Sequence, residues 1–201
     1  MARVEFWFEF ASTYSYPAAW RIEAQAAAAG VKVEWCPFLL GPIFAEQGWG
    51  DSPFNLYPEK GRYMWRDLER TCADLELPFR RPSQFPRNGL LAARVACAAA
   101  GAPWLGEYVR RVFQANFAED RDISDPQVVR EVLSSLDLSA DLLELAKDPA
   151  VKTDLRERTE RARQLAIFGA PSFRAGNELF WGNDRLAQAL EWALGETDGL
   201  A

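Results

Sequence analysis

Apolar and polar residues alternate at the start of the chain. Within residues 3–10 every even position carries an apolar side chain, and three of the four odd positions are charged. A period of two residues is typical of a β-strand. Residues 31–36 alternate in the same way, with Val31, Val33 and Trp35 on one side, and this pattern predicts a second strand.

A helix is predicted between these two strands. Residues 17–29 are rich in alanine and contain no helix breaker after Pro17, which suits a first helical turn. Gly30 suits the C-terminal end of the same helix. A strand, a helix and a strand of these lengths form a βαβ unit, in which the two strands run parallel.

The C-terminal part of the chain returns to strand patterns. Residues 171–175 and 178–181 flank Gly176–Asn177, a two-residue hairpin signal, and a helix is predicted over residues 184–194. The whole order is therefore β-α-β, a block of helices, then β-β-α. A central sheet built from both ends of the chain, with helices inserted between them, satisfies the rules for connections in an α/β fold.

The middle of the chain supplies the block of helices. Residues 37–59 contain four prolines and three glycines, which predict a loop or a region of short helices. Apolar residues then recur at helical spacing, and oppositely charged side chains in the last segment stand four positions apart. Helices are expected over residues 60–76, 88–100, 104–118, 125–136, 139–146 and 149–167.

Composition narrows the function. The formal net charge is −6, from 23 basic and 29 acidic side chains, which argues against non-specific binding to nucleic acid. The sequence contains no histidine, so mechanisms with an imidazole base and histidine-based zinc sites are excluded, and we expect no metal. No apolar run is long enough to span a membrane, and no signal-peptide pattern is present. We therefore expect a soluble, cytoplasmic protein.

The cysteines fit that compartment. Cys36, Cys72 and Cys97 form no CxxC pair. An odd and scattered set of this kind is typical of buried free thiols in a reducing environment. We expect all three to be structural.

Chemistry is first expected in the segment that joins the first strand to the first helix, which contains Ser12 and Ser15. Ligands of open α/β sheets bind at this edge. The free N–H groups and partial positive charge of a helix N-terminus favour an anion such as a thiolate. The alternative is that Ser12 and Ser15 are ordinary N-caps.

Three other segments carry candidate site residues. Pro171 stands at the start of a strand, where it is either a cis-proline or a plain trans strand-start proline. Asn183 and Asp184 follow the hairpin, where they cap the last helix or hold the charged amino-acid end of a ligand. Lys60, in a proline-rich and aromatic stretch, binds a carboxylate or is a solvated lysine at a helix start.

Together these segments resemble the kappa-class glutathione transferases and, more closely, the 2-hydroxychromene-2-carboxylate isomerases. The matching stretches are FEFASTYSY, PEKGRYMWRDLER, FPRNGLLAAR and GAPSF followed by ELFWGNDRL, in the right order over nearly the whole chain. The resemblance implies a thioredoxin-like fold with an inserted all-helical domain, as in DsbA. Residues 1–60 and 166–201 would form the thioredoxin-like domain, and residues 61–165 the insertion. A homodimer with glutathione as cofactor is also implied.

The resemblance further implies roles for individual residues. Ser12, at the position of the first cysteine of a CxxC motif, would hydrogen-bond the sulfur of glutathione and favour its thiolate. Pro171 would be a cis-proline, and the backbone of Ala170 would pair with the cysteinyl part of glutathione as an added strand. Asn183 and Asp184 match the pair that holds the γ-glutamyl end.

Lys60 matches a lysine near the glutathione site. The sequence departs from the family pattern at Thr13, where many relatives have proline, and at Asp51, where relatives often have asparagine. Asp51 would repel a carboxylate, and Asn55 is near it but out of register. Asn88 is expected to line the substrate cavity with them, or to cap a helix.

The implied activity is the glutathione-dependent cis/trans isomerisation of a 2-hydroxychromene-2-carboxylate, a small aromatic substrate, through reversible addition of the thiolate. This chemistry needs neither histidine nor metal. A kappa-like transferase that conjugates glutathione to electrophiles is the nearest alternative. A protein dithiol oxidase is disfavoured by the missing CxxC. A non-catalytic binding module that keeps the fold is a further alternative, and Asp51 is its best support. The aromatic residues expected to shape the pocket are Phe38, Trp49, Phe54 and Tyr57.

Overall fold

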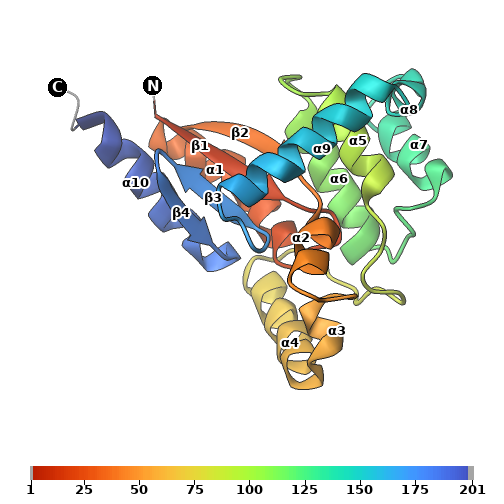
Figure 1. Ribbon diagram of the computed structural model, residues 1–201, viewed down its shortest axis with the longest axis horizontal. Coiled ribbons are helices and arrows are strands. Elements are labelled where there is room, and N and C mark those ends of the chain that lie inside the picture. The colour runs from red at the N-terminus through yellow and green to blue at the C-terminus, as the bar shows by residue number, and fades with distance from the viewer. Residues whose placement is uncertain (1, 199–201) are drawn as a thin grey trace.

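The computed structural model describes residues 2–198 and contains one mixed sheet (Figure 1). The strands follow the order β2-β1-β3-β4. Strand β1 runs parallel to β2 and antiparallel to β3, which is antiparallel to β4. The strands are β1 (Arg3–Phe8), β2 (Lys32–Pro37), β3 (Ser172–Ala175) and β4 (Glu178–Trp181). The sheet is thus built from both ends of the chain, as the order of predicted elements implied.

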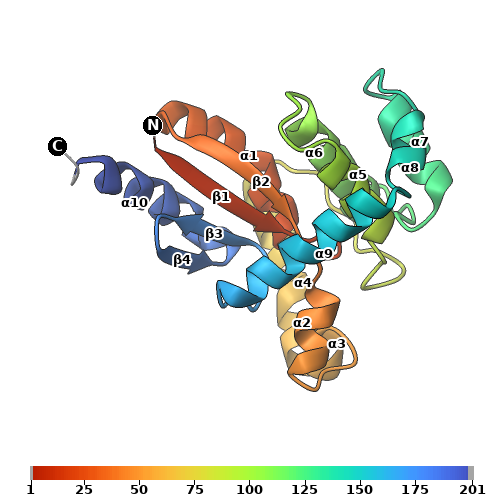
Figure 2. The same cartoon turned by 45° about the horizontal axis from the view of Figure 1, so that its top comes forward.

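Helices surround the sheet and extend away from it (Figures 1 and 2). Helices α1 and α10 pack together, and α9 runs from the sheet to the group formed by α5, α6, α7 and α8. Helices α3 and α4 pack on each other and project from the rest of the molecule. The helices are α1 (Ser15–Ala29), α2 (Leu40–Glu46), α3 (Pro53–Leu56), α4 (Pro58–Asp74), α5 (Leu90–Ala98), α6 (Leu105–Phe117), α7 (Pro126–Ser134), α8 (Asp141–Leu145), α9 (Pro149–Gln164), the 3-10 helix η1 (Asn183–Arg185) and α10 (Leu186–Asp198).

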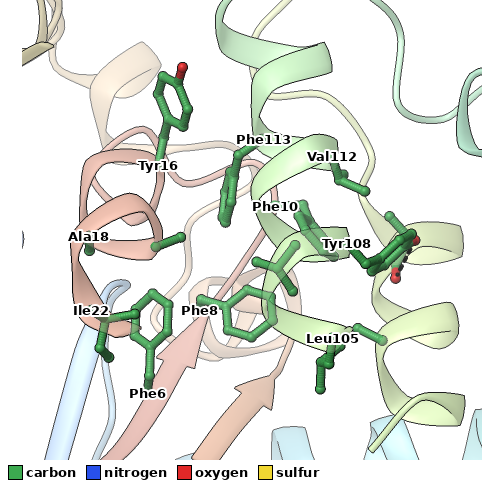
Figure 3. Close-up of a cluster of buried hydrophobic side chains, with 14 of the residues drawn as sticks. Phe6, Phe8, Phe10, Tyr16, Ala18, Ile22, Leu105, Tyr108, Val112 and Phe113 are labelled. Atoms are coloured by element: carbon green, nitrogen blue, oxygen red, sulfur yellow. Dashed lines mark hydrogen bonds between the residues drawn. The ribbon is translucent and has the colours of Figure 1, made fainter. Parts of the chain in front are cut away.

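Strand β1 is buried on both faces because helices cover the sheet on both sides. Its even positions belong to the larger apolar core, where Phe8 lies close to Phe113 of α6 (Figure 3). The odd position Trp7 belongs to a smaller core with Phe38. Glu5, on the same face as Trp7, is only 2% exposed, and its carboxylate accepts hydrogen bonds from Trp7 and Arg161. The alternation in β1 therefore directs side chains into a different core on each face of the sheet. It does not direct one face into a core and the other into solvent.

Several predicted helices are two or three residues too long. Helices α4, α7 and α9 end before residues that adopt a left-handed conformation: Glu76 (φ 51), Asp137 (φ 55) and Ala166 (φ 56). Behind each of them an amide bonds back to a carbonyl of the last turn, for example Ile167 N to Ala162 O at 2.9 Å. These are helix-ending motifs that usually carry glycine, so no glycine marks these three helix ends in the sequence.

The predicted strands were also slightly too long. Strand β1 ends at Phe8 because the chain turns there, and the Ser12 amide donates to the Glu9 carbonyl at 2.9 Å. Strand β3 begins at Ser172 because Pro171 follows a cis peptide and has no N–H to donate to a ladder. The proline-rich stretch contains the short helices α2 and α3, one of the two predicted alternatives.

Candidate functional site

A large cleft opens where β1 ends and α1 begins. Its volume is about 1320 Å³, above the roughly 300–1,000 Å³ of a site for one small ligand. It therefore has room for a tripeptide and an aromatic molecule together. Eight of the nine predicted site residues line it: Ser12, Asp51, Lys60, Asn88, Ala170, Pro171, Asn183 and Asp184.

Ser12 lines this cleft and connects two segments of the chain. Its hydroxyl donates a hydrogen bond to the Ala170 carbonyl oxygen at 2.8 Å. Its oxygen accepts one from the amide of Ser15, the first residue of α1, at 3.3 Å. The N-cap position of α1 is Tyr14, and the buried Ser15 hydroxyl has no hydrogen-bond partner among the described residues, so neither serine is an ordinary N-cap. The Ser12 hydroxyl donates its one proton to Ala170 and accepts from Ser15 at the same time, because a serine hydroxyl is both a donor and an acceptor.

The loop opposite Ser12 has the conformation that the resemblance implied. The peptide between Ala170 and Pro171 is cis. The Pro171 carbonyl accepts a hydrogen bond from the Gly182 amide at 3.0 Å, which ties this loop to the end of β4. Gly182 has a φ of +115°, a conformation that favours glycine. The two turns that flank the cleft are thereby held against each other.

Asn183 is positioned by Arg21, a residue that the sequence analysis did not single out. The Arg21 guanidinium donates to the Asn183 side-chain oxygen at 2.6 Å and to its carbonyl oxygen at 2.8 Å. Helix α1 therefore fixes the residue that follows the hairpin. Asp184 forms an ion pair with Arg185 at 3.3 Å. No sequence motif connects Arg21 with Asn183, because they are 162 positions apart.

The charges of the cleft leave one cation available. Arg87 is paired with Asp120, and Arg185 with Asp184. The Lys60 ammonium instead lies 4.8 Å from the centroid of the Tyr57 ring. Among the described residues that line the cleft, Lys60 is therefore the cation without an ion pair, which suits a ligand carboxylate.

Asp51 and Asn55 form a unit at the rim of the cleft. The Asn55 amide donates to the two Asp51 carboxylate oxygens at 3.2 and 3.0 Å, and to the Phe85 carbonyl at 3.1 Å. Asn55 is exposed and, unlike Asp51, is not among the residues that line the cleft. Its amide is turned toward Asp51 because a carboxylate is the strongest acceptor within reach.

Asn88 lines the cleft and also contacts the start of a helix, whose N-cap position is Gly89. Its side-chain oxygen accepts a hydrogen bond from the Leu90 amide at 2.9 Å, at the start of α5. Beside it Arg87 is only 3% exposed and donates to Asn116, Asp120, Ser83 and the Arg121 carbonyl. This network holds the cleft wall.

Two of the four expected pocket aromatics lie elsewhere. Trp49 and Phe54 line the cleft. Phe38 is fully buried in the smaller core, and Tyr57 is exposed outside the cleft. The strand pattern continues through Phe38, which explains its burial.

The sequence analysis missed an aromatic pair at the rim. Phe168 and Trp181 line the cleft with ring centroids 4.9 Å apart, and they are 46% and 54% exposed. Phe168 directly precedes the motif GAPSF, and Trp181 directly precedes the motif GND. This position beside two candidate site segments was the sequence signal that could have identified the pair. Exposed aromatic side chains beside a cleft are typical of ligand contacts.

Glu9 is a second missed residue of the cleft. Burial raises its pKa to about 7, against a smaller lowering by a hydrogen bond from the Ala11 backbone. Its place at the end of the first strand, three residues before Ser12, was the available signal.

The three cysteines are free and buried, as expected. Burial raises the pKa of Cys72 and of Cys97 to about 12, and raises that of Cys36 further. A thiol with a raised pKa is a poor nucleophile at neutral pH. The described part of the chain has no helix long and apolar enough to cross a membrane, and no group of three or more acidic or cysteine side chains arranged to hold a metal.

Known proteins share this architecture and much of the sequence order. Residues 3–192 match the model of the DsbA-like thioredoxin domain. A 2-hydroxychromene-2-carboxylate isomerase of Sphingobium xenophagum is 30% identical over 185 residues, which cover 91% of this chain and 93% of that protein. Human glutathione S-transferase kappa 1 is 28% identical over 205 residues, 94% of this chain and 85% of that protein.

A solved structure of a 2-hydroxychromene-2-carboxylate isomerase has a TM-score of 0.83 with this chain, at 25% identity and with 99% of each chain covered. The family model, the two sequence relatives and this solved structure all indicate the same family. The chain therefore belongs to the family of DsbA-like thioredoxin-domain proteins that includes the 2-hydroxychromene-2-carboxylate isomerases and the kappa-class glutathione transferases.

Proposed function

We propose that this protein is a glutathione-dependent isomerase of 2-hydroxychromene-2-carboxylate-like aromatic compounds. The observation that carries the proposal is the position of Ser12 at the N-terminus of α1, 2.8 Å from the carbonyl that precedes cis-Pro171, in a cleft large enough for two ligands. Relatives named as isomerases of this substrate support it.

The residues of the cleft fit glutathione. An anionic sulfur would be held by the Ser12 hydroxyl and by the positive end of α1. The Ala170 backbone would pair with the middle of the peptide, and Lys60 would hold a carboxylate. Asn183, fixed by Arg21, and Asp184 would hold the amino-acid end.

The Ser12 hydroxyl would change its acceptor when the ligand binds. It now donates to the neutral Ala170 carbonyl. A thiolate is a charged acceptor, and hydrogen bonds to charged acceptors are roughly twice as strong. When bound, glutathione supplies a sulfur nucleophile that adds reversibly to a conjugated carbon and leaves again. The role of the protein is to lower the pKa of this sulfur and to orient the aromatic partner.

A kappa-like transferase is the second candidate, and Asp51 favours it. Its carboxylate lines the cleft and would repel the carboxylate of a chromene substrate. A neutral electrophile would not meet this repulsion. The expected cytoplasmic location and homodimer stay predictions for either activity.

Isothermal titration of reduced glutathione tests the site. We expect binding to the wild type and weaker binding to Ser12→Ala. Ser124→Ala is the matched control, because Ser124 is exposed and does not line the cleft. Absence of binding to the wild type at millimolar glutathione would refute the proposal.

Turnover distinguishes the two activities. The wild type is expected to isomerise a 2-hydroxychromene-2-carboxylate, and Ser12→Ala to lower that turnover by about 10- to 1000-fold, as expected for the loss of one positioned hydrogen-bond donor. Wild-type turnover of an aryl halide without isomerisation would establish the transferase instead.

A further inference from the structure

Ring opening of a 2-hydroxychromene moves a proton, and few residues of this chain are able to carry one near neutral pH. The sequence has no histidine. Burial raises the pKa of all three cysteine thiols and of Tyr14, Tyr16 and Tyr108. A proton carrier must therefore be sought among the carboxyl groups of the cleft.

Four carboxyl groups line the cleft, and three of them are engaged by partners. Asp51 accepts from Asn55, and Asp184 pairs with Arg185. Asp67 accepts from the Tyr14 hydroxyl at 2.9 Å and pairs with Arg70, which lies outside the cleft. Glu9, the fourth, has no ion pair with any described residue.

Glu9 lies beside Ser12. It follows the last residue of β1, and its carbonyl accepts a hydrogen bond from the Ser12 amide at 2.9 Å. The Ala11 amide bonds its side chain, and no charged group contributes to the shift of its pKa. Burial alone raises that pKa to about 7, which matches the pKa of an efficient general acid–base catalyst at neutral pH.

We propose that Glu9 is the catalytic acid–base residue that transfers the proton during opening and closing of the chromene ring. This inference rests on the proposed isomerase function. The Glu9 carboxylate takes the proton of the 2-hydroxyl group, whose O–H electron pair becomes the new C=O bond. The C–O bond to the ring oxygen breaks, its electron pair stays on that oxygen, and the Glu9 carboxyl group returns the proton to give a phenol. This ring-opening step needs no other reactant.

The test uses Glu9→Gln, which keeps the shape of the side chain and removes its titration. Two reactions are measured with one preparation: isomerisation of a 2-hydroxychromene-2-carboxylate, which moves a proton between substrate oxygens, and conjugation of an aryl halide, which does not. We expect isomerisation to fall by about 100-fold or more, with loss of its pH transition near 7. Conjugation and glutathione affinity are expected to stay within about two-fold of wild type. Glu178→Gln, an exposed carboxylate on β4, is the matched control.

The outcomes distinguish a catalytic role of Glu9 from a structural role, and both from failure of the proposed isomerase function. Equal losses of both reactions in Glu9→Gln would indicate a structural role and overturn the inference, as would an unchanged isomerisation rate and pH profile. A wild type that binds glutathione but does not isomerise the chromene would overturn the proposed isomerase, and the Glu9 role with it. Independently of activity, infrared difference spectra should show a protonated carboxyl group that titrates near pH 7 in the wild type and is missing in Glu9→Gln.

Discussion

At the scale of single residues, the cleft is built from side chains that each serve the fold and the site. The Ser12 oxygen accepts a hydrogen bond from the first amide of α1, and its hydroxyl donates to the Ala170 carbonyl. Asn88 accepts a hydrogen bond from the first amide of α5 while it lines the same cleft. Capping and ligand binding use the same polar groups at helix N-termini, so a sequence that predicts one role leaves the other open.

Asp51 gives the first prediction at this scale. Asp51→Asn should lower the KM for a 2-hydroxychromene-2-carboxylate by about two- to five-fold, the effect of removing roughly 0.5–1 kcal/mol of charge repulsion near solvent. Steady-state kinetics with that substrate and with a neutral aryl halide measure the effect, and the KM for the halide should not change. Asp74→Asn, on the exposed end of α4, is the control. An equal change with both substrates would show that charge is not the cause.

Glu9 gives the second prediction at this scale, which concerns the pH dependence of stability. The folded protein holds the Glu9 proton up to pH about 7, whereas the pKa of an ordinary glutamate is 4.5. At Glu9 the folded state therefore binds more protons between these values, and the contribution of Glu9 to stability falls as the pH rises from 4.5 to 7. Glu9→Gln lacks this loss and should be more stable above pH 7, by an amount on the order of 3 kcal/mol. Urea unfolding at pH 4 and pH 8 checks this, and a difference that does not shrink at pH 4 would contradict it.

At the scale of elements, the wall that carries Asn88 depends on one buried arginine. Arg87 donates to Asn116 at 3.2 Å, to the Arg121 carbonyl at 2.9 Å and to Asp120. It joins the segment before α5 to the end of α6. Hydrogen bonds from Ser83 and Arg87 lower the pKa of Asp120 to about 2. The stability that this carboxylate contributes is therefore present above pH 3.8 and is lost as the pH falls through 2.

Arg87→Lys should destabilise the protein by about 2–4 kcal/mol, because an ammonium group has one nitrogen where the guanidinium fork reaches several acceptors. Thermal unfolding would show a melting temperature lower by roughly 4–16 °C for a chain of this size. Arg66→Lys is the control, since Arg66 makes an exposed pair with Glu69 that is expected to be nearly neutral. A similar melting temperature in both variants would show that the Arg87 network is not structural.

The elements were largely predictable because hydrophobic periodicity is strong in this chain. Period two located β1 and β2, and the Gly176–Asn177 signal located the hairpin of β3 and β4. Helix ends were less predictable, because α4, α7 and α9 stop at Glu76, Asp137 and Ala166 rather than at glycine. Tertiary packing selects these left-handed residues, and it leaves no local signal.

Only the site residues that lie in local sequence motifs were predictable. Ser12, Pro171 and Asn183 lie in loops whose pattern marks them, and all three line the cleft. Arg21 was missed, because its contact with Asn183 joins segments at opposite ends of the chain. Asn55 lies beside Asp51 rather than among the residues that line the cleft, and no local signal shows this, because the contact depends on how α3 is oriented.

At the scale of the whole molecule, the thioredoxin-like part and the helical part share one core. Phe10 lies beside Phe113 of α6 (Figure 3), with the ring centroids 5.1 Å apart. The ring centroids of Tyr16 in α1 and Phe117 in α6 are 5.7 Å apart. Arg110 of α6 also forms an ion pair with Glu23 of α1. The predicted boundaries near residues 60 and 165 therefore divide the sequence, and we propose that they do not divide the chain into independently folding units.

This proposal predicts that the chain unfolds in one transition. Two units with separate cores would melt separately, whereas a shared aromatic core makes each part lose its packing when the other unfolds. Calorimetry should give a single peak whose calorimetric and van't Hoff enthalpies agree. Phe113→Ala should lower the stability of the whole transition by about 3–5 kcal/mol without splitting it. Phe168→Ala, at a side chain 46% exposed, should change it much less. Two resolved peaks, or a Phe113→Ala effect confined to one of them, would mean that the helical insertion is a domain in its own right, and that the cleft lies between two bodies free to move.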